Sequence, residues 1–336
     1  MILAGDVGGT KCNLGLFSQE GDVLRAVFHR RLVTRDYPSF EKLIADFLQQ
    51  ALSSAGADTS SIDAATLAVA GLIVAGRHHS ENLPWVVDVA PLARRLSLKS
   101  VELLNDLAAT ALSLHHLSAS DLVSLNVGVA VPGATRGVIA AGTGLGEAIL
   151  FWDGSSYQVA AAEGGHADFA PRTERQIEFF RYLKRHLVHV SCEEVVSGRG
   201  FRRVHEFLDP AVRHESFDSV SANAASEITQ LALAQSCPVC EETLAFWIEM
   251  YGALCGNFAL QTMALGGLYV AGGIAVKILP VLQKGIFFEA FCGTGRLAGE
   301  LSRVPVFVVT NEDAPMLGAA YHAGSRAIRS EFPQRT

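Results

Sequence analysis

Runs of apolar residues alternate with polar or glycine-rich turns along the chain, a pattern that predicts an α/β protein. Three apolar stretches within 2–28 are separated by a glycine turn and a polar turn, so we expect three strands there. Apolar residues at helical spacing predict a helix over 37–55. Apolar runs over 62–71 and 101–104 are typical of buried strands, and an Ala/Leu-rich helix is expected over 107–117.

The second half of the chain begins with the same pattern. We expect strands over 137–141, 145–152 and 157–160, around a second glycine-rich loop. Helices are then expected over 174–186, 193–208, 222–234 and 241–265. A strand, a glycine turn and a helix start follow over 266–274. A final strand is expected over 304–309, and residues 311–315 cap the last helix.

The first glycine turn combines a carboxylate with flexible backbone. Asp6 precedes Val7, Gly8, Gly9 and Thr10, and apolar strands flank the turn on both sides. Glycines let the backbone approach a ligand closely and direct N–H groups at an anion, and a nearby carboxylate suits a divalent cation bound to phosphate. An ordinary glycine-rich hairpin with a turn aspartate has the same local sequence, so this motif leaves both interpretations open.

The second glycine loop contains Gly142, Thr143 and Gly144 and also lies between two apolar segments. Dinucleotide-binding glycines stand between a strand and a helix, whereas residues 148–152 continue here as a strand. Two strand–loop–strand units in one chain predict two related α/β domains. Their loops would then bind one polyphosphate from opposite sides.

Composition narrows the class of protein. The chain has 336 residues, about half of them apolar, and a formal net charge of −7. This length is enough for two domains with cores of ordinary size. The negative charge, with no basic patch or helix-turn-helix pattern, argues against nucleic-acid binding. No apolar run is long enough to span a bilayer and no signal-peptide pattern precedes Asp6, so we expect a soluble, cytoplasmic protein that does not bind membranes.

Two of the six cysteines, Cys237 and Cys240, form a Cys-Pro-Val-Cys motif. A zinc site needs further ligands, and no second cysteine pair or histidine stands near the motif at a spacing typical of zinc sites. A redox motif normally follows a strand of a small βαβ domain, whereas this one precedes a long apolar helix. We therefore expect reduced thiols near a helix start, with a metal or redox role as the alternative.

Six short motifs together resemble the bacterial ATP-dependent glucokinases of the actin/hexokinase/Hsp70-like superfamily, over nearly the whole chain. They are Leu3-Ala4-Gly5-Asp6-Val7-Gly8-Gly9-Thr10, Asn105-Asp106-Leu107, Ala141-Gly142-Thr143-Gly144-Leu145-Gly146, Glu163-Gly164-Gly165-His166, Ser197-Gly198-Arg199-Gly200 and Val270-Ala271-Gly272-Gly273-Ile274. Related sugar kinases with a repressor branch carry a zinc-binding cysteine cluster soon after the fourth motif. Residues 167–171 contain no such cluster, which favours the zinc-free glucokinase group. Lys11-Cys12-Asn13 differs from the Asn-Ala-Arg of some members.

The resemblance implies a two-domain actin-like ATPase (ribonuclease H-like) fold, in which each domain is a mixed sheet flanked by helices and a cleft lies between them. The small domain would span 1–115 plus 310–336, and the large domain 116–309. The implied ligands are ATP, Mg²⁺ and glucose, and a homodimer is implied as well. The implied residues are Asp6, Gly8, Gly9, Thr10, Gly142, Thr143 and Gly144 for the ATP phosphates, with Mg²⁺ at Asp6 directly or through water; Gly272 and Gly273 for adenosine; and Asn105, Asp106, Glu163, His166 and Glu193 for the sugar. Asp106 would face the 6-hydroxyl as the catalytic base.

Several of these residues also have a structural interpretation. Asp106 suits the N-cap of the helix over 107–117, and His166 suits a hydrogen-bonded core position. Glu193, next to Glu194, suits the first turn of a helix. Asn82 is either a turn residue or a sugar contact. The six motifs together favour the catalytic and sugar-binding roles.

We therefore predict the reaction ATP + D-glucose → ADP + glucose 6-phosphate, with Mg²⁺. A positioned base, in-line geometry and a cation on the departing phosphates are what phosphoryl transfer to a hydroxyl needs. A kinase for another hexose, polyphosphate as the donor, and a catalytically silent sugar sensor remain as alternatives. Asp106 and the two glycine loops argue against the sensor.

Overall fold

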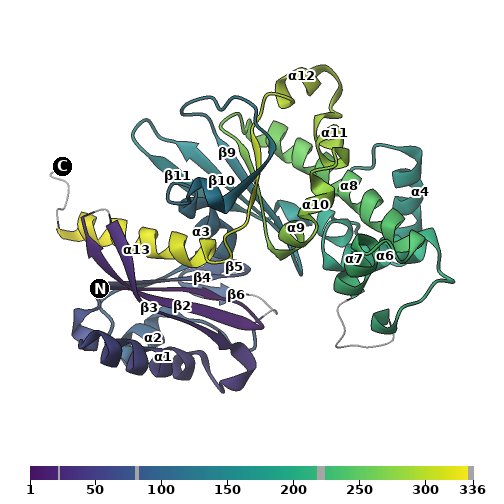
Figure 1. Ribbon diagram of the computed structural model, residues 1–336. Coiled ribbons are helices and arrows are strands. Elements are labelled where there is room, and N and C mark those ends of the chain that lie inside the picture. The colour runs from purple at the N-terminus through teal and green to yellow at the C-terminus, as the bar shows by residue number, and fades with distance from the viewer. Residues whose placement is uncertain (22, 80–82, 218–223, 332–336) are drawn as a thin grey trace. The chain divides into compact units, whose positions relative to one another are not determined.

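The computed structural model describes residues 1–21, 23–79, 83–217 and 224–331 (Figure 1). The chain divides into two compact units. Unit 1 contains Met1–Leu117 and Asn311–Thr336, and unit 2 contains Ser118–Thr310. The C-terminal segment therefore returns to the unit that begins with the N-terminal strand.

Unit 1 is built on a five-stranded mixed sheet in the order β3-β2-β1-β4-β7. The pairs β1–β2 and β2–β3 are antiparallel, and the pairs β1–β4 and β4–β7 are parallel. The strands are β1 (Ile2–Val7), β2 (Lys11–Glu20), β3 (Val23–Val33), β4 (Ala64–Val69) and β7 (Val101–Asn105), and a separate hairpin pairs β5 (Leu72–Val74) with β6 (Arg77–His79). The helices are α1 (Phe40–Ala55), α2 (Val89–Leu96), α3 (Asp106–Ser113) and α13 (Ala314–Glu331), with 3₁₀ turns η1 (Thr34–Asp36) and η2 (Thr59–Ser61).

Helices cover both faces of this sheet, so its central strands are apolar on both sides. In β1, Leu3 packs in the cluster that contains the buried side chains of α1, whereas Ile2 and Ala4 pack with α13. Successive side chains of a strand point to opposite faces, and a strand buried on both faces therefore has an unbroken apolar run. An added Cβ at Gly318 of α13 would collide with the Ala109 carbonyl of α3, so glycine permits these two helices to pack closely.

Unit 2 contains a six-stranded sheet in the order β11-β10-β9-β12-β13-β8. Its strands are β8 (Leu122–Asn126), β9 (Arg136–Ala141), β10 (Leu145–Trp152), β11 (Tyr157–Ala162), β12 (Leu268–Ala271) and β13 (Val306–Val309). Its helices are α4 (Glu174–Leu183), α5 (Cys192–Val195), α6 (Gly198–Leu208), α7 (Ala224–Leu233), α8 (Pro238–Thr262), α9 (Gly273–Lys277), α10 (Leu279–Leu282), α11 (Ile286–Cys292) and α12 (Ala298–Leu301), with 3₁₀ turns η3 (Ala119–Asp121), η4 (Gly164–His166), η5 (Glu215–Phe217) and η6 (Gly295–Leu297).

Helix α8 is the centre of the unit 2 core, and Figure 1 shows it among α6, α7 and α11. Its side chains are buried on nearly all sides, and Trp247 and Tyr251 are completely buried. An apolar surface all around a helix is typical of a helix inside a core. Gly252 and Gly256 lie directly against backbone carbonyls of α11, where any Cβ would collide, so these glycines set the approach of the two helices.

The two sheets share one topology. Strands β3-β2-β1-β4-β7 of unit 1 correspond in order and direction to β11-β10-β9-β12-β13 of unit 2, and β8 is added antiparallel to β13. Each glycine loop joins the equivalent antiparallel pair, β1–β2 or β9–β10. This confirms the prediction of two related α/β domains, each with a mixed sheet flanked by helices.

Some expected elements differ from the observed ones. The helix expected over 193–208 is wrong as one element, because it divides into α5 and α6, with Ser197 as the N-cap residue of α6. The hairpin β5–β6 and strand β8 were not predicted. Asn82 lies outside the described residues. In the described part of the chain, no helix has both the length and the hydropathy needed to cross a membrane.

Candidate functional site

In unit 1, hydrogen bonds from the neighbouring 3₁₀ turn η1 hold the β1–β2 loop in place. The Gly8 N–H donates to the Lys11 carbonyl at 3.0 Å, which closes the loop. Thr34 donates its hydroxyl to the Gly8 carbonyl at 2.8 Å, and its N–H donates to the Thr10 carbonyl at 3.0 Å. Gly9 and Thr10 are exposed. The loop is therefore fixed on its inner side and accessible to a ligand at its tip.

The parallel strands bring Asp6 and Asn105 to one edge of the sheet. Val7 pairs with Val69, and Val69 pairs with Asn105, so β1, β4 and β7 end at the same level. Ligands of α/β sheets bind at such carboxyl ends. The register thus places the first glycine loop and the start of α3 close to each other within unit 1.

The Asp6 carboxyl group lies in an environment that disfavours its charge. Burial raises the pKa of Asp6, and the Asp106 and Asp313 carboxylates add to this effect against the Arg31 guanidinium, so that the pKa lies at about 7. Carboxylates grouped in this way are a donor set that a divalent cation prefers. Asp6 is therefore placed as a cation or phosphate-site residue would be.

Three further residues of this edge were not predicted from the sequence. Asn13 Nδ2 donates to Asp313 Oδ1 at 2.6 Å, and Arg31 Nη2 lies 3.6 Å from the same oxygen. The sequence assigned Asp313 only to the capping segment of the last helix. The signal that was available is the acidic turn Asn311-Glu312-Asp313, but only the return of the chain to unit 1 places it beside β2.

Helix α3 is capped by Asn105, so the interpretation of Asp106 as the N-cap is wrong. Asn105 Oδ1 accepts the N–H groups of Leu107 and Ala108 at 3.0 and 3.1 Å. Asp106 is the first helical residue, and its Oδ1 accepts the Leu107 N–H at 2.9 Å. Because Asn105 supplies the cap, the Asp106 carboxylate is not needed to begin the helix.

In unit 2, Glu193 supports the second glycine loop. Its Oε2 accepts the Leu145 N–H at 3.0 Å, and its Oε1 pairs with Arg199. The loop is closed by the Gly142 N–H, which donates to the Gly144 carbonyl at 2.8 Å. A Cβ at Gly144 would lie 2.5 Å from Glu193 Oε2. A larger residue at Gly144 would therefore disturb this support.

The segment that contains Glu163 and His166 forms the exposed 3₁₀ turn η4. The two side chains are 54% and 65% exposed, and His166 Nε2 lies 3.8 Å from Glu163 Oε2. Beneath them, the buried Glu147 of β10 lies against Gly164, where a Cβ would collide with its carboxylate. Burial raises the pKa of Glu147 to about 7. Glu147 was not predicted as a site residue, although an acidic residue in an apolar strand was an available signal.

A pocket of about 920 Å³ lies within unit 2. Three of the predicted nucleotide residues line it together: Gly142 and Thr143 from the β9–β10 loop, and Gly273 from the start of α9. The left-handed φ of +89° at Gly272 turns the chain from β12 into α9, which a glycine adopts without strain. Gly144 and Gly272 lie next to these residues in the chain but are not part of the lining.

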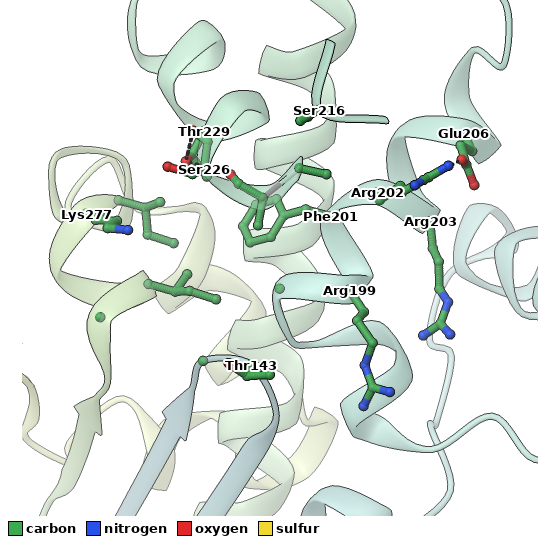
Figure 2. Close-up of a pocket in the computed structure, with 17 residues that line it drawn as sticks. Thr143, Arg199, Phe201, Arg202, Arg203, Glu206, Ser216, Ser226, Thr229 and Lys277 are labelled. Carbon is green, nitrogen blue, oxygen red and sulfur yellow. Dashed lines mark hydrogen bonds and ion pairs between the residues drawn. The ribbon is translucent and has the colours of Figure 1, made fainter. Parts of the chain in front are cut away.

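Figure 2 shows Lys277 on one side of this pocket and Arg199 and Arg202 on the other. Arg199 pairs with Glu193, and Arg202 Nε lies 2.8 Å from Glu206 Oε1. Lys277 has no acidic partner at ion-pair distance among the residues that the structure describes. These cations, with Gly142 and its backbone, suit a ligand that carries phosphate groups. Lys277 was not predicted from the sequence.

Comparisons with known proteins agree over nearly the full length. The glucokinase family matches residues 3–326. A glucokinase of Nostoc punctiforme is 36% identical over 339 residues, covering 95% of this chain and 98% of the relative. A glucokinase of Mesorhizobium japonicum is 32% identical and covers 97% of this chain and 92% of its own length.

Solved structures give the same result. The crystal structure of a glucokinase from an Antarctic psychrotroph has a TM-score of 0.82 at 29% identity and covers 96% of this chain and 98% of its own. A glucokinase of Balamuthia mandrillaris in complex with glucose shares the fold, with a TM-score of 0.77 at 22% identity over 96% of this chain and 93% of its own. The expected actin-like ATPase fold is thereby confirmed. The chain belongs to the glucokinase family.

Proposed function

We propose that this chain is an ATP-dependent glucokinase that transfers the γ-phosphoryl group of ATP to the 6-hydroxyl of D-glucose. The observation that carries the mechanism is the position of Asp106, where β7 ends and α3 begins, at the sheet edge that also holds Asp6. Glucose and ATP as substrates come from the family and its relatives.

Asp106 accepts the proton of the sugar 6-hydroxyl in this mechanism. The hydroxyl oxygen forms the new bond to the γ-phosphorus, and the bond between that phosphorus and the ADP oxygen breaks. Loss of the proton makes the oxygen a better nucleophile as the transfer proceeds. Because Asn105 caps α3, the Asp106 side chain can serve the substrate without weakening the helix.

The nucleotide is assigned to the two glycine loops and the unit 2 pocket. Gly142, Thr143 and Gly273 line that pocket, and Lys277 adds an exposed cation to its wall. Backbone N–H groups of the loops bind phosphate oxygens without a fixed positive charge, which explains how a chain of net charge −7 binds ATP. Gly8, Gly9 and Thr10 serve the phosphates from unit 1 in the same way.

The residues at Asp6 fit a magnesium ion. Burial, followed by the neighbouring Asp106 and Asp313 carboxylates, raises the pKa of Asp6, and a bound cation would favour its charged form. We assign Mg²⁺ to Asp6, directly or through water. When bound, the ion neutralises charge on the departing phosphates.

We assign sugar contacts to Asn105, Asp106, Glu163 and His166, as the family resemblance implies. The exposed Glu163 and His166 side chains are free to pair with sugar hydroxyls, and such pairs discriminate against analogues that lack the matching group. Glu193 already contacts Leu145 and Arg199, so its Oε1 must leave Arg199 to reach a sugar.

A coupled assay that follows ADP or sugar phosphate tests this proposal. We expect activity with ATP and glucose, and a lower kcat/KM with mannose and N-acetylglucosamine. A higher kcat/KM with another hexose would assign that hexose as the substrate instead of glucose. Activity with polyphosphate but not ATP would replace the donor, and glucose binding without turnover in any combination would favour a silent sensor.

A further inference from the structure

Four side chains with metal-binding atoms meet in unit 2, outside the proposed catalytic residues. His205 lies near the end of α6, and His214 lies between α6 and η5. Cys237 precedes α8 as its N-cap residue, and Cys240 belongs to the first turn of that helix. Their ligand atoms all lie within 4.8 Å of one another. The expectation that no histidine joins the Cys237–Cys240 motif is therefore wrong.

The cluster could not be predicted from the local sequence, because its members are distant along the chain. Helix α7 and a turn lie between the histidines and the cysteine pair. The packing of α6, α7 and α8, which Figure 1 shows side by side, brings the two segments together. His205 and Cys240 are completely buried, whereas His214 and Cys237 are partly exposed.

The three separations from His214 Nε2 match the edges of a tetrahedral zinc site. Cys240 Sγ and Cys237 Sγ lie 3.2 and 3.9 Å from His214 Nε2, and His205 Nε2 lies 3.2 Å from the same nitrogen. Zn–S bonds of about 2.3 Å and Zn–N bonds of about 2.0–2.1 Å give ligand-to-ligand distances of about 3.3–3.8 Å in a tetrahedron. Each observed distance lies within a few tenths of an ångström of that range.

Hydrogen bonds alone do not account for this arrangement. A neutral imidazole Nε2 carries either one proton or one lone pair, so it serves one hydrogen bond at a time. His214 Nε2 nevertheless has two sulfur atoms and one nitrogen around it. His205 Nδ1 is buried with no hydrogen-bond partner, so Nε2 is the ring atom that faces another polar group. A shared central ion explains why four atoms converge on one point.

We propose that His205, His214, Cys237 and Cys240 bind one structural Zn²⁺ ion. Two thiolates and two neutral imidazoles balance the charge of a divalent ion, which makes the site neutral and suits its burial. A set of two sulfur and two nitrogen ligands at tetrahedral spacing selects zinc over magnesium or calcium, which prefer oxygen. All four protein ligands are present, so the site is closed, as structural zinc sites are.

The ion would link the α6 side of the proposed nucleotide pocket to α8 in the core of unit 2. Glu206 follows His205, and Ser216 lies two residues after His214; both line the pocket. The cysteines anchor the same site to α8, the central helix of unit 2. Zinc binding therefore stabilises unit 2 and fixes the α6 side of the pocket.

Metal analysis of the untagged full-length protein tests the site. The protein is produced with added Zn²⁺, passed over a desalting column and analysed by mass spectrometry for metals. We expect about one zinc per chain in the wild type, and loss of that zinc in Cys240→Ser and His214→Ala. The matched control is Cys292→Ser, which changes another partly buried cysteine of unit 2 outside the cluster and should keep the zinc.

A second measurement needs no variant. Wild-type protein refilled with Co²⁺ should gain the visible and thiolate charge-transfer absorption of a tetrahedral site with sulfur ligands. Wild type that holds no zinc or Co²⁺ after equilibration under reducing conditions overturns the proposal. Equal zinc content in Cys240→Ser and Cys292→Ser would also overturn it. We also expect metal-depleted enzyme to have a higher KM for ATP and a nearly unchanged KM for glucose. This kinetic result depends on the proposed function, whereas the measured zinc content does not.

Discussion

Replacing Asp106 by asparagine separates its proposed chemical role from its structural role. The substitution keeps the size of the side chain and its Oδ1 acceptor for the Leu107 N–H, which lies 2.9 Å away. It removes the carboxylate that can accept a proton. Because Asn105 supplies two hydrogen bonds to the helix start, the cap of α3 remains complete.

The expected change in stability is small. Loss of a negative charge in the first turn of a helix costs about 0.3–1 kcal/mol. The same loss removes repulsion between Asp106 and Asp6, which acts in the opposite direction. The net change in the free energy of unfolding should stay within about 1 kcal/mol, which corresponds to a Tm shift of no more than about 4 °C.

The expected change in turnover is much larger. Removal of a general base lowers the rate by about 10²–10⁴, or about 2.7–5.4 kcal/mol in the activation free energy. The Asp106 carboxylate interacts most strongly with the 6-hydroxyl proton in the transition state. The values of kcat and kcat/KM for glucose should therefore fall together, while glucose affinity changes little.

The assay combines coupled kinetics over glucose and ATP, calorimetric glucose binding and thermal unfolding. Glu41→Gln is the matched control, because it also converts a carboxylate to an amide in the first turn of a unit 1 helix, away from the proposed site residues. We expect a comparable Tm shift in that control and wild-type kcat. Asp106→Asn with wild-type kcat would falsify the base assignment, and unfolding of the variant would show that the carboxylate has a structural role instead.

Three other perturbations test the rest of the site. Gly273→Ala adds a Cβ with no neighbour within 4 Å, so we expect a fold as stable as the wild type but ATP binding weaker by about tenfold. The control is Gly299→Ala in α12, where an added Cβ also has no neighbour within 4 Å and ATP should bind normally. Equal ATP affinities of the two variants in calorimetry would contradict the pocket assignment. Because the pKa of Asp6 is raised to about 7, the folded protein retains a proton that the unfolded chain releases, so without Mg²⁺ the free energy of unfolding should fall as pH rises from about 4 to about 7. Mg²⁺-dependent ATP binding should instead strengthen as pH rises through about 7. Asp6→Asn should lose this dependence and weaken the pH dependence of unfolding, to which Glu147 also contributes; a variant that keeps the wild-type pH dependence of both excludes Asp6. Glu163→Gln should raise the glucose KM and alter the KM ratios among glucose, mannose and 2-deoxyglucose, and unchanged ratios would remove Glu163 from the sugar site.

Local patterns were sufficient for most of the sheet. The apolar segments on both sides of each glycine turn predicted β1, β2, β9 and β10, because strands buried on both faces have nearly unbroken apolar runs. The apolar faces also predicted α1 and α8, although α1 begins at Phe40 and α8 at Pro238. Helix α5 was merged with α6 in the prediction, although Ser197, a preferred N-cap residue that Gly198 follows, was a local signal of the break.

The sequence by itself determined which residues could carry chemistry. The six motifs in order, through the family that they resemble, selected Asp106, the two glycine loops and the Glu163–His166 segment. Only the tertiary structure decided which partners these residues have. Asp313 reaches Asn13, Glu193 reaches Leu145, and His205 reaches Cys240 through packing of elements far apart in the chain. Local periodicity specifies the face on which a side chain lies, whereas such contacts depend on how whole elements pack.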